Sequence, residues 1–125
     1  MDKLFINSTY TTPQINFDAE AGLLEVEGRL IPEDPEIFFS PVENWIDNFR
    51  PEKNSKTIVR FKLSYYNTSS AKKMLHVFKK FDAFFLSGSD IKIIWEYEDG
   101  DEDTMHDGED YKRFLQIPFE IKKTP

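Results

Sequence analysis

The stretch SYYNTSSAKKML, residues 64–75, is where a strand pattern gives way to a helix pattern. The segment that leads into it, TIVRFKLSYY (57–66), is rich in β-branched and aromatic residues, which favours a central strand of a sheet. Beyond it, apolar residues recur at helical spacing while lysines mark the opposite side, so we predict the longest helix of the chain. Its expected core stripe consists of Ala71, Met74, Leu75, Phe78, Phe81 and Phe85.

The turn between this strand and this helix carries Asn67 followed by three consecutive hydroxyls, Thr68, Ser69 and Ser70. A side-chain oxygen at the start of a helix accepts a hydrogen bond from a free amide and stabilises the helix by about 1 kcal/mol. One residue suffices for that, so the other hydroxyls are surplus, and we expect them to project outward from the end of the sheet. An accessible hydroxyl is open to a kinase, and the helix dipole favours a phosphate there. The turn therefore has two interpretations, a helix cap and a phosphorylation site.

The N-terminal part of the chain contains strand patterns. A short apolar run covers Leu4 to Ile6, and QINFD (14–18) and GLLEVEG (22–28) both alternate apolar and polar residues. Because a tight connection separates the two alternating segments, we predict that they form a hairpin.

The segment IFFSPVENWIDNFR (37–50) has the spacing of one helical face. Pro41 suits the first turn of a helix, with Ser40 as the expected cap, and this leaves about two and a half turns. The expected core residues of this helix are Phe38, Val42, Trp45, Ile46 and Phe49.

The C-terminal part contains two further strand patterns, IKIIWEY (91–97) and QIPFEIKK (116–123). The segment between them is too polar at its start to build core, and we expect only a helical turn or two, anchored by Tyr111, Phe114 and Leu115. The order of elements predicts a single mixed β-sheet with helices packed against it, in one domain that covers residues 1–125.

Composition narrows the function classes. With 16 basic and 23 acidic residues the formal net charge is −7, which would repel nucleic acid and anionic membrane surfaces. The absence of cysteine removes disulfides, thiolate metal sites and a cysteine nucleophile. No stretch approaches the roughly 18 to 20 apolar residues of a membrane span, and the N-terminus lacks the apolar core of a signal peptide. We therefore expect a cytoplasmic protein without a nucleic-acid or membrane partner.

The acidic segment between Glu96 and Asp107 is dense in oxygen ligands and includes His106. Its spacing departs from that of calcium-binding loops, so a solvated acidic face is the better interpretation. His76 and His106 are isolated from each other and from any evident nucleophile. The five glycines form no phosphate-binding loop, so nucleotide binding is unsupported and no cofactor is expected.

Four stretches taken in order resemble a known family. They are YTTPQINFD (10–18), GLLEVEGRLIPEDPEIFFSPVENWI (22–46), LSYYNTSSAKKML (63–75) and WEYEDGDEDTMHDGEDYKRFLQIPFEI (95–121). Over about residues 10–121 the chain resembles the SiaC family of bacterial regulatory phosphoproteins. The most specific part of the resemblance is the Asn-Thr-Ser-Ser turn, supported by GRLIPE (28–33) and by the acidic segment that leads to LQIPF (115–119).

The resemblance implies a small α/β domain similar to anti-sigma factor antagonists. It implies phosphorylation on the threonine of the turn by a dedicated serine/threonine kinase, and dephosphorylation by a metal-dependent phosphatase. It also implies that the unphosphorylated form binds and stimulates a diguanylate cyclase, which promotes c-di-GMP signalling, aggregation and biofilm.

Carried onto this sequence, the resemblance makes Thr68 the phosphoacceptor, framed by Asn67, Ser69 and Ser70. The family often continues this turn with Ser-Lys, whereas this chain has Ala-Lys at 71–72, which removes one secondary acceptor but leaves Thr68 in place. We assign a partner surface at the same end of the domain to Pro32, Glu33 and Asp34.

The leading hypothesis is a non-enzymatic partner-switching protein, with ATP and Mg²⁺ supplied by the kinase. One alternative is an anti-sigma factor antagonist that acts on a sigma-factor inhibitor. The other, from a different class, is a carboxylate-metal hydrolase that uses Asp99, Asp101, Asp103 and His106.

Overall fold

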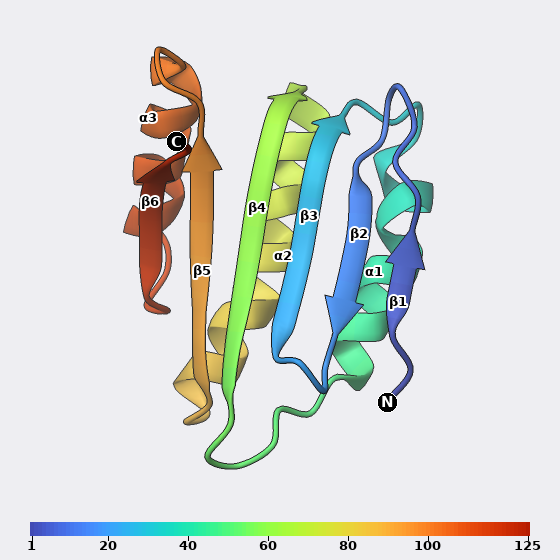
Figure 1. The fold of residues 1–125 in the computed structure, drawn as a ribbon, viewed down its shortest axis with the longest axis vertical. Helices are drawn as coiled ribbons and strands as arrows, with labels where there is room; N and C mark the ends of the chain where they lie inside the picture. The colour runs from blue at the N-terminus through green and yellow to red at the C-terminus, as the bar shows by residue number, and fades with distance from the viewer.

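The computed structural model describes residues 1–125 as a six-stranded sheet with three helices (Figure 1). The strands are β1 (Leu4–Ile6), β2 (Gln14–Asp18), β3 (Leu23–Leu30), β4 (Lys56–Tyr66), β5 (Asp90–Tyr97) and β6 (Phe119–Lys123). The helices are α1 (Pro35–Asn48), α2 (Thr68–Leu86) and α3 (Glu102–Arg113). None of these helices is both long enough and apolar enough to cross a bilayer.

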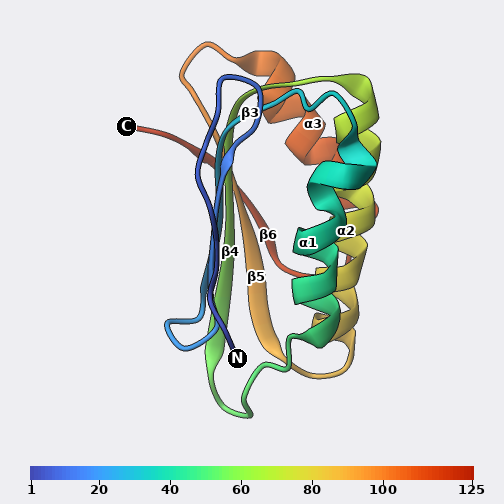
Figure 2. The ribbon, with the colours of Figure 1, turned by 90° about the vertical axis from the view of Figure 1, so that its right-hand side faces the viewer.

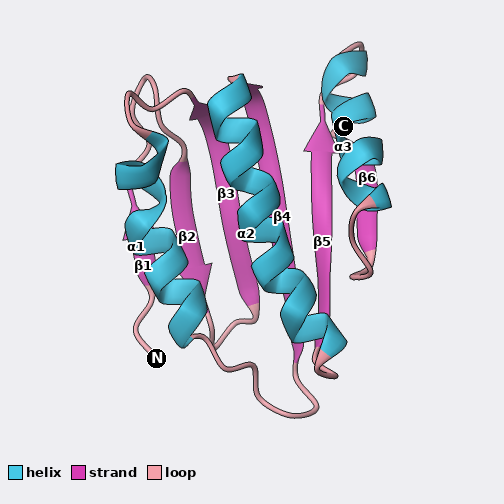
Figure 3. Ribbon diagram, turned by 180° about the vertical axis from the view of Figure 1, so that it is seen from behind, coloured by secondary structure: helices cyan, strands magenta, loops and turns pink.

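The strands lie in the sheet in the same order as in the chain, from β1 to β6. The pairs β1–β2 and β2–β3 are antiparallel, which confirms the predicted hairpin, and the pairs from β3 to β6 are parallel. Crossovers between parallel strands are right-handed in nearly all proteins, and here each one moves to the next strand on the same side. All three helices therefore cover one face of the sheet, as two views show (Figure 2, Figure 3). The predicted single mixed sheet with helices packed against it is confirmed.

The core lies between the helices and the covered face of the sheet, and Phe78 of α2 is at its centre. The Phe78 ring lies 4.9 Å from Phe61 of β4 and 6.0 Å from Trp95 of β5, measured between ring centroids. It also lies 5.2 Å from Tyr111 of α3 and 5.7 Å from Phe119 of β6. One side chain thus joins four other elements, and these contacts are edge-to-face, a geometry that aromatic pairs prefer.

The prediction of which α2 residues form the core is correct for the centre of the stripe and wrong along one edge. Its fully buried members are Met74, Phe78 and Phe81. Its members that are only partly buried are Ala71, Leu75 and Phe85. Val77, which the sequence analysis left out, is fully buried. The buried face of the helix is therefore shifted slightly toward Val77.

The helix α1 begins earlier than predicted. Asp34, and not Ser40, is its cap: the Asp34 carboxylate accepts hydrogen bonds from the amides of Glu36 (3.0 Å) and Ile37 (3.3 Å). Pro35 follows at the first helical position, where its missing N–H costs nothing. Pro41 is inside the helix, on its exposed side, where water can hydrate the carbonyl that the proline leaves without a donor.

The earlier start also changes the core face of α1. Phe39 is buried in place of the predicted Phe38, which is only partly buried. The other expected core residues of this helix are buried as predicted, namely Val42, Trp45, Ile46 and Phe49.

The acidic segment forms a longer helix than predicted, and its end differs too. Tyr111 and Leu115 are buried as expected, but Phe114 is 67% exposed and anchors nothing. The last strand begins three residues later than the pattern suggests, because the amides of Gln116 and Ile117 donate to the carboxylate of Asp82 on α2 (2.8 and 2.7 Å). These amides are therefore engaged by a helix before the strand starts.

The open face of the sheet carries charged side chains that pair with one another. Arg60 of β4 donates to Glu25 of β3 (2.7 Å) and to Glu96 of β5 (2.5 Å). Lys62 lies 3.7 Å from Glu27. Burial lowers the pKa of Arg60, but the hydrogen bonds with Glu96 and Glu25 outweigh it and raise the pKa above the ordinary arginine value. The two cations at the centre of this face are thus paired within the chain, with glutamates in excess.

We predict that Phe78→Ala lowers the free energy of unfolding by roughly 3 to 5 kcal/mol, because a cavity opens where five elements meet. Urea denaturation of the wild type and of the variant measures this. Leu86→Ala is the control, since Leu86 is on the same helix but 65% exposed. Equal denaturation midpoints for Phe78→Ala and the control would show that Phe78 is not a core residue.

Candidate functional site

In the turn after β4, the residue that caps α2 is not one of the exposed hydroxyl residues. Asn67 is the cap of α2, with an extended backbone, and its side-chain oxygen accepts hydrogen bonds from the Ser70 amide (3.0 Å) and from the Ser69 hydroxyl (3.2 Å). Thr68 occupies the first helical position, is exposed, and its hydroxyl makes no hydrogen bond within the chain. The helix is therefore capped without using Thr68.

Ser70 corrects the expectation that the surplus hydroxyls all project outward. Its exposed fraction is 0%, and its hydroxyl oxygen has no hydrogen-bond partner. Ser70 lies one turn before Met74 on the side of α2 that packs against the sheet, so its direction follows from the helix period. Only Thr68 and Ser69 remain accessible in this turn.

The residues assigned to a partner surface, in the loop after β3, also differ in exposure and in structural role. Pro32 is buried, Glu33 is exposed, and Asp34 caps α1, so its carboxylate already has a structural role. Because β3 and β4 run in parallel, the loop after β3 and the turn after β4 lie at the same end of the sheet (Figure 1). The structure thus brings both predicted parts of the site to one end of the molecule.

The helices α1 and α2 are joined by ion pairs. Lys73 lies 3.1 Å from Glu36 and 3.2 Å from Glu43 of α1. Lys72, one turn after Thr68 on the same side of α2, is exposed and has no acidic partner. A free cation is therefore available near the Thr68 hydroxyl.

The helix α3 braces the turn from the other side. The Tyr66 hydroxyl donates to the Asp107 carboxylate (2.5 Å), and the Tyr111 hydroxyl donates to the carbonyl of Ala71 (3.1 Å). Burial and the neighbouring Asp107 raise the pKa of both tyrosines, so both phenols remain protonated donors even in alkaline solution. The residue just before the cap and the first turn of α2 are both fixed to α3.

A third contact docks α3 on the sheet. The indole N–H of Trp95 donates to the carbonyl of Thr104 (2.8 Å), and Gly108 lies directly against the indole. A Cβ atom on Gly108 would be 2.5 Å from the Trp95 ring, which is itself 1% exposed and enclosed by other aromatic rings. Glycine is therefore needed here for close approach of the helix.

We predict that Gly108→Ala destabilises the protein by about 1 to 2 kcal/mol, because overpacking against Trp95 exceeds the gain of about 1 kcal/mol in helix propensity. Urea denaturation is the measurement, with His106→Ala as a control at an exposed position of the same helix. A Gly108→Ala midpoint above that of the wild type would contradict the close packing of α3.

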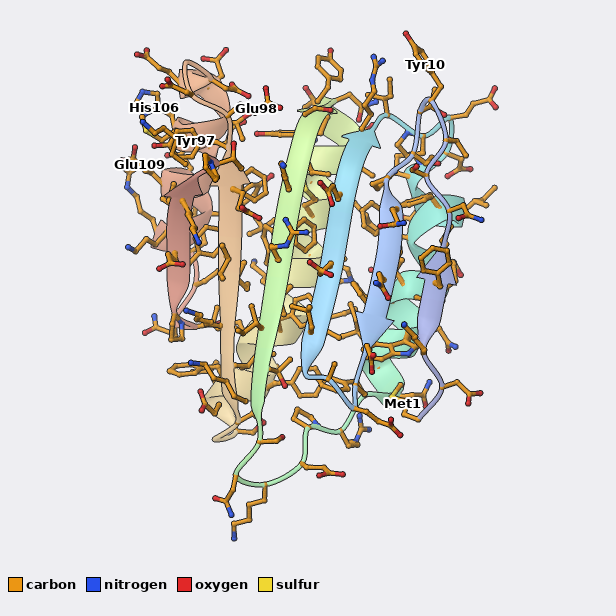
Figure 4. All side chains as sticks on the ribbon, viewed as in Figure 1. Met1, Tyr10, Tyr97, Glu98, His106 and Glu109 are labelled. Atoms are coloured by element: carbon orange, nitrogen blue, oxygen red, sulfur yellow. The ribbon has the colours of Figure 1, made fainter.

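The acidic residues proposed for a metal hydrolase have separate roles. Asp101 caps α3, accepting from the Thr104 amide (3.1 Å) and hydroxyl (2.7 Å). Asp99 and Asp103 are exposed, and His106 points away from the body of the protein, with Nδ1 3.3 Å from Glu109 (Figure 4). No group of three or more such side chains in the chain is arranged to hold a metal ion. The geometry gives the hydrolase hypothesis no support.

We predict that Asp101→Ala costs about 1 kcal/mol through loss of the cap, whereas Asp99→Ala changes the free energy of unfolding by less than about 0.5 kcal/mol. Thermal melts of both variants test this. Calorimetric titration of the wild type with Mg²⁺, Mn²⁺ and Ca²⁺ should detect no tight site. A tight site that Asp99→Ala abolishes would revive the hydrolase hypothesis.

The chain is similar to known proteins over nearly its whole length. A family model described as SiaC family regulatory phosphoprotein matches residues 6–124. The chain belongs to the SiaC family. An uncharacterised protein of Pseudomonas aeruginosa (strain UCBPP-PA14) is 28% identical over 122 residues, which cover 98% of this chain and 97% of that protein. The resemblance drawn from residues 10–121 is thereby confirmed.

Two solved structures of SiaC from Pseudomonas aeruginosa agree in fold with this SiaC family member. SiaC itself has a TM-score of 0.88 at 27% identity, covering 99% of this chain and all of that one (100%). The matching chain in a crystal structure of the diguanylate cyclase SiaD with its activator SiaC has a TM-score of 0.89 at 27% identity, covering 97% and 99% of the two chains.

Sequence reasoning missed the part of this candidate site that lies outside the turn. Tyr66, Asp107 and Gly108 come from distant segments, and their contacts are tertiary. The one available signal was Gly108, a glycine in an otherwise helical segment, which indicates close packing when it is not a helix end.

Proposed function

We propose that this chain is a non-enzymatic partner-switching regulator that is controlled by reversible phosphorylation of Thr68. A serine/threonine kinase adds the phosphate and a metal-dependent phosphatase removes it. The unphosphorylated form binds and stimulates a diguanylate cyclase, and so acts in c-di-GMP signalling. Membership in a family of regulatory phosphoproteins supports this, as does the solved complex in which the related SiaC is the activator of the diguanylate cyclase SiaD.

The observation that carries the choice of residue is the division of work in the turn. Asn67 caps α2 and Ser70 is buried, so Thr68 is exposed and free of structural duty. A kinase that docks at this end can therefore modify the Thr68 hydroxyl without breaking a hydrogen bond inside the chain.

Phosphorylation at Thr68 is compatible with the folded state. The phosphate would lie beside the free amides of the first helical turn and at the positive end of the helix dipole. Lys72 is one turn further along and has no acidic partner within the chain. The modification therefore adds charge to the surface and leaves α2 intact.

The same phosphate is costly within an interface. It brings about 1.5 to 2 negative charges, and burying such an anion without paired cations costs several kcal/mol. A loss of about 2.7 kcal/mol in binding free energy lowers affinity a hundredfold. Because the chain already has a formal net charge of −7, the added charge also strengthens repulsion from acidic partners.

We predict that Thr68→Ala remains folded, with a loss of stability within about 1 kcal/mol. Because this variant accepts no phosphate, it should bind the cyclase whether or not the kinase is active. Thr68→Asp should bind more weakly than wild type but not fail completely, since one carboxylate carries less charge than a phosphate. Intact-protein mass after incubation with the cognate kinase and ATP, followed by fragment mapping, tests the acceptor.

Ser69→Ala is the matched control, because Ser69 is the other exposed hydroxyl of the turn. Phosphate incorporation should be lost in Thr68→Ala and kept in Ser69→Ala. The reverse pattern would assign the phosphorylation to Ser69. Phosphate incorporation in both variants would show that neither residue is the sole acceptor.

A further inference from the structure

Three side chains lie together on the surface at the end of the sheet that carries the Thr68 turn. The guanidinium carbon of Arg29, in β3, lies 4.4 Å from the ring centroid of Tyr10. Arg29 is also the register partner of Tyr65 in β4, so these two side chains emerge from neighbouring strands. Tyr10 is 78% exposed and Tyr65 is 56% exposed. We call these three residues the end patch, and Figure 4 shows Tyr10 at the end of the molecule toward which β3 and β4 run.

The end patch is held in place by its backbone. The hydroxyl of Thr9 accepts hydrogen bonds from the amides of Thr11 (3.2 Å) and Thr12 (3.0 Å), which closes the turn that carries Tyr10. The Ile31 amide donates to the carbonyl of Thr11 (2.8 Å) and fastens this turn to the segment after β3. An aromatic ring that is exposed yet fixed loses little conformational entropy when a partner covers it.

Arg29 has no acidic partner, although acidic residues outnumber basic ones in this chain. Among the four arginines, Arg60 and Arg113 are paired with carboxylates, and Arg50 donates to backbone carbonyls. Only the ring of Tyr10 positions Arg29, so the donors of its guanidinium are left without a partner in the chain. A planar guanidinium held on an aromatic ring is suited to bind a carboxylate with two parallel hydrogen bonds.

We propose that the end patch is the part of the cyclase interface that binds an acidic segment of the diguanylate cyclase. Arg29 takes a carboxylate of that segment, while Tyr10 and Tyr65 pack against an adjacent apolar side chain. Tyrosine and arginine are among the residue types that dominate binding energy at interfaces, which suits this role. The inference rests on the proposed function, since it names where on the chain the same partner docks.

The location of the end patch also explains how a phosphate on Thr68 would act on it. Thr68 follows Tyr65 by three residues, so their Cα atoms are at most about 11 Å apart. The screening length at physiological ionic strength is about 8 Å, so a phosphate's charge is largely screened at the greatest separation and is felt more strongly at shorter distances or at lower salt. Repulsion between the phosphate and the partner's carboxylate then lowers affinity even without direct overlap.

The test uses the full chain and the full-length diguanylate cyclase encoded in the same genome, with affinity measured by titration calorimetry at low and at physiological salt. Arg29→Gln should weaken binding roughly 30-fold and reduce its salt dependence. Tyr10→Leu should weaken binding severalfold because Arg29 loses its support, and Tyr10→Phe should bind nearly as wild type because the ring remains.

Arg113→Gln is the control, because it changes the net charge equally at an exposed site on α3. Equal affinities of Arg29→Gln and Arg113→Gln, with wild type binding normally, would overturn the end patch alone. Failure of the wild type to bind the cyclase would overturn the proposed function and this inference together. If Arg29→Gln weakens binding while the kinase phosphorylates it at the wild-type rate, the end patch is specific to the cyclase.

Discussion

The order of the strands, identical to their order in the chain, is the constraint from which the rest of the molecule follows. Each parallel crossover moves one strand further in the same direction, so every helix is laid on the same face. Because β3, β4 and β5 are parallel, α1, α2 and α3 also all start at the same end of the sheet (Figure 1). Helix starts bring free amides and positive dipole ends with them, so one end of the protein collects these features.

The exposed Thr68 hydroxyl and the contacts that hold its turn in place also lie at this shared end. The turn before α2 is short, and it is fixed from outside: Tyr66 is bonded to Asp107, and Tyr111 is bonded to the first turn of α2. The acidic helix thus has a structural role that its composition hides. A rigid turn presents the Thr68 hydroxyl in one geometry, which is what the proposed kinase and partner would both need.

Much of the fold could be predicted from sequence because its signals are local. Alternation predicted the β2–β3 hairpin, and the change from period two to period 3.6 predicted the passage from β4 to α2. Errors arose where two local signals competed: Asp34 and Ser40 are both acceptable caps, and because Asp34 is the cap, Phe39 is buried and Phe38 only partly so. Of the candidate site, only the turn was predictable. The direction of Ser70 depends on how α2 is rotated against the sheet, and the bond between Tyr66 and Asp107 joins residues 41 positions apart, which no periodicity encodes.

Under the proposed function, charge explains how the domain would switch partners without changing shape. Arg60 is paired with glutamates on the open face and Lys73 is paired with glutamates of α1, so neither cation is available to a partner. Although the same end also carries the acidic start of α3, Arg29 and Lys72 are the cations near Thr68 that have no acidic partner in the chain. A phosphate of about −2 is comparable to their summed charge and opposite in sign. A single covalent group can therefore cancel the attraction at the interface while every buried contact of the fold stays as it was.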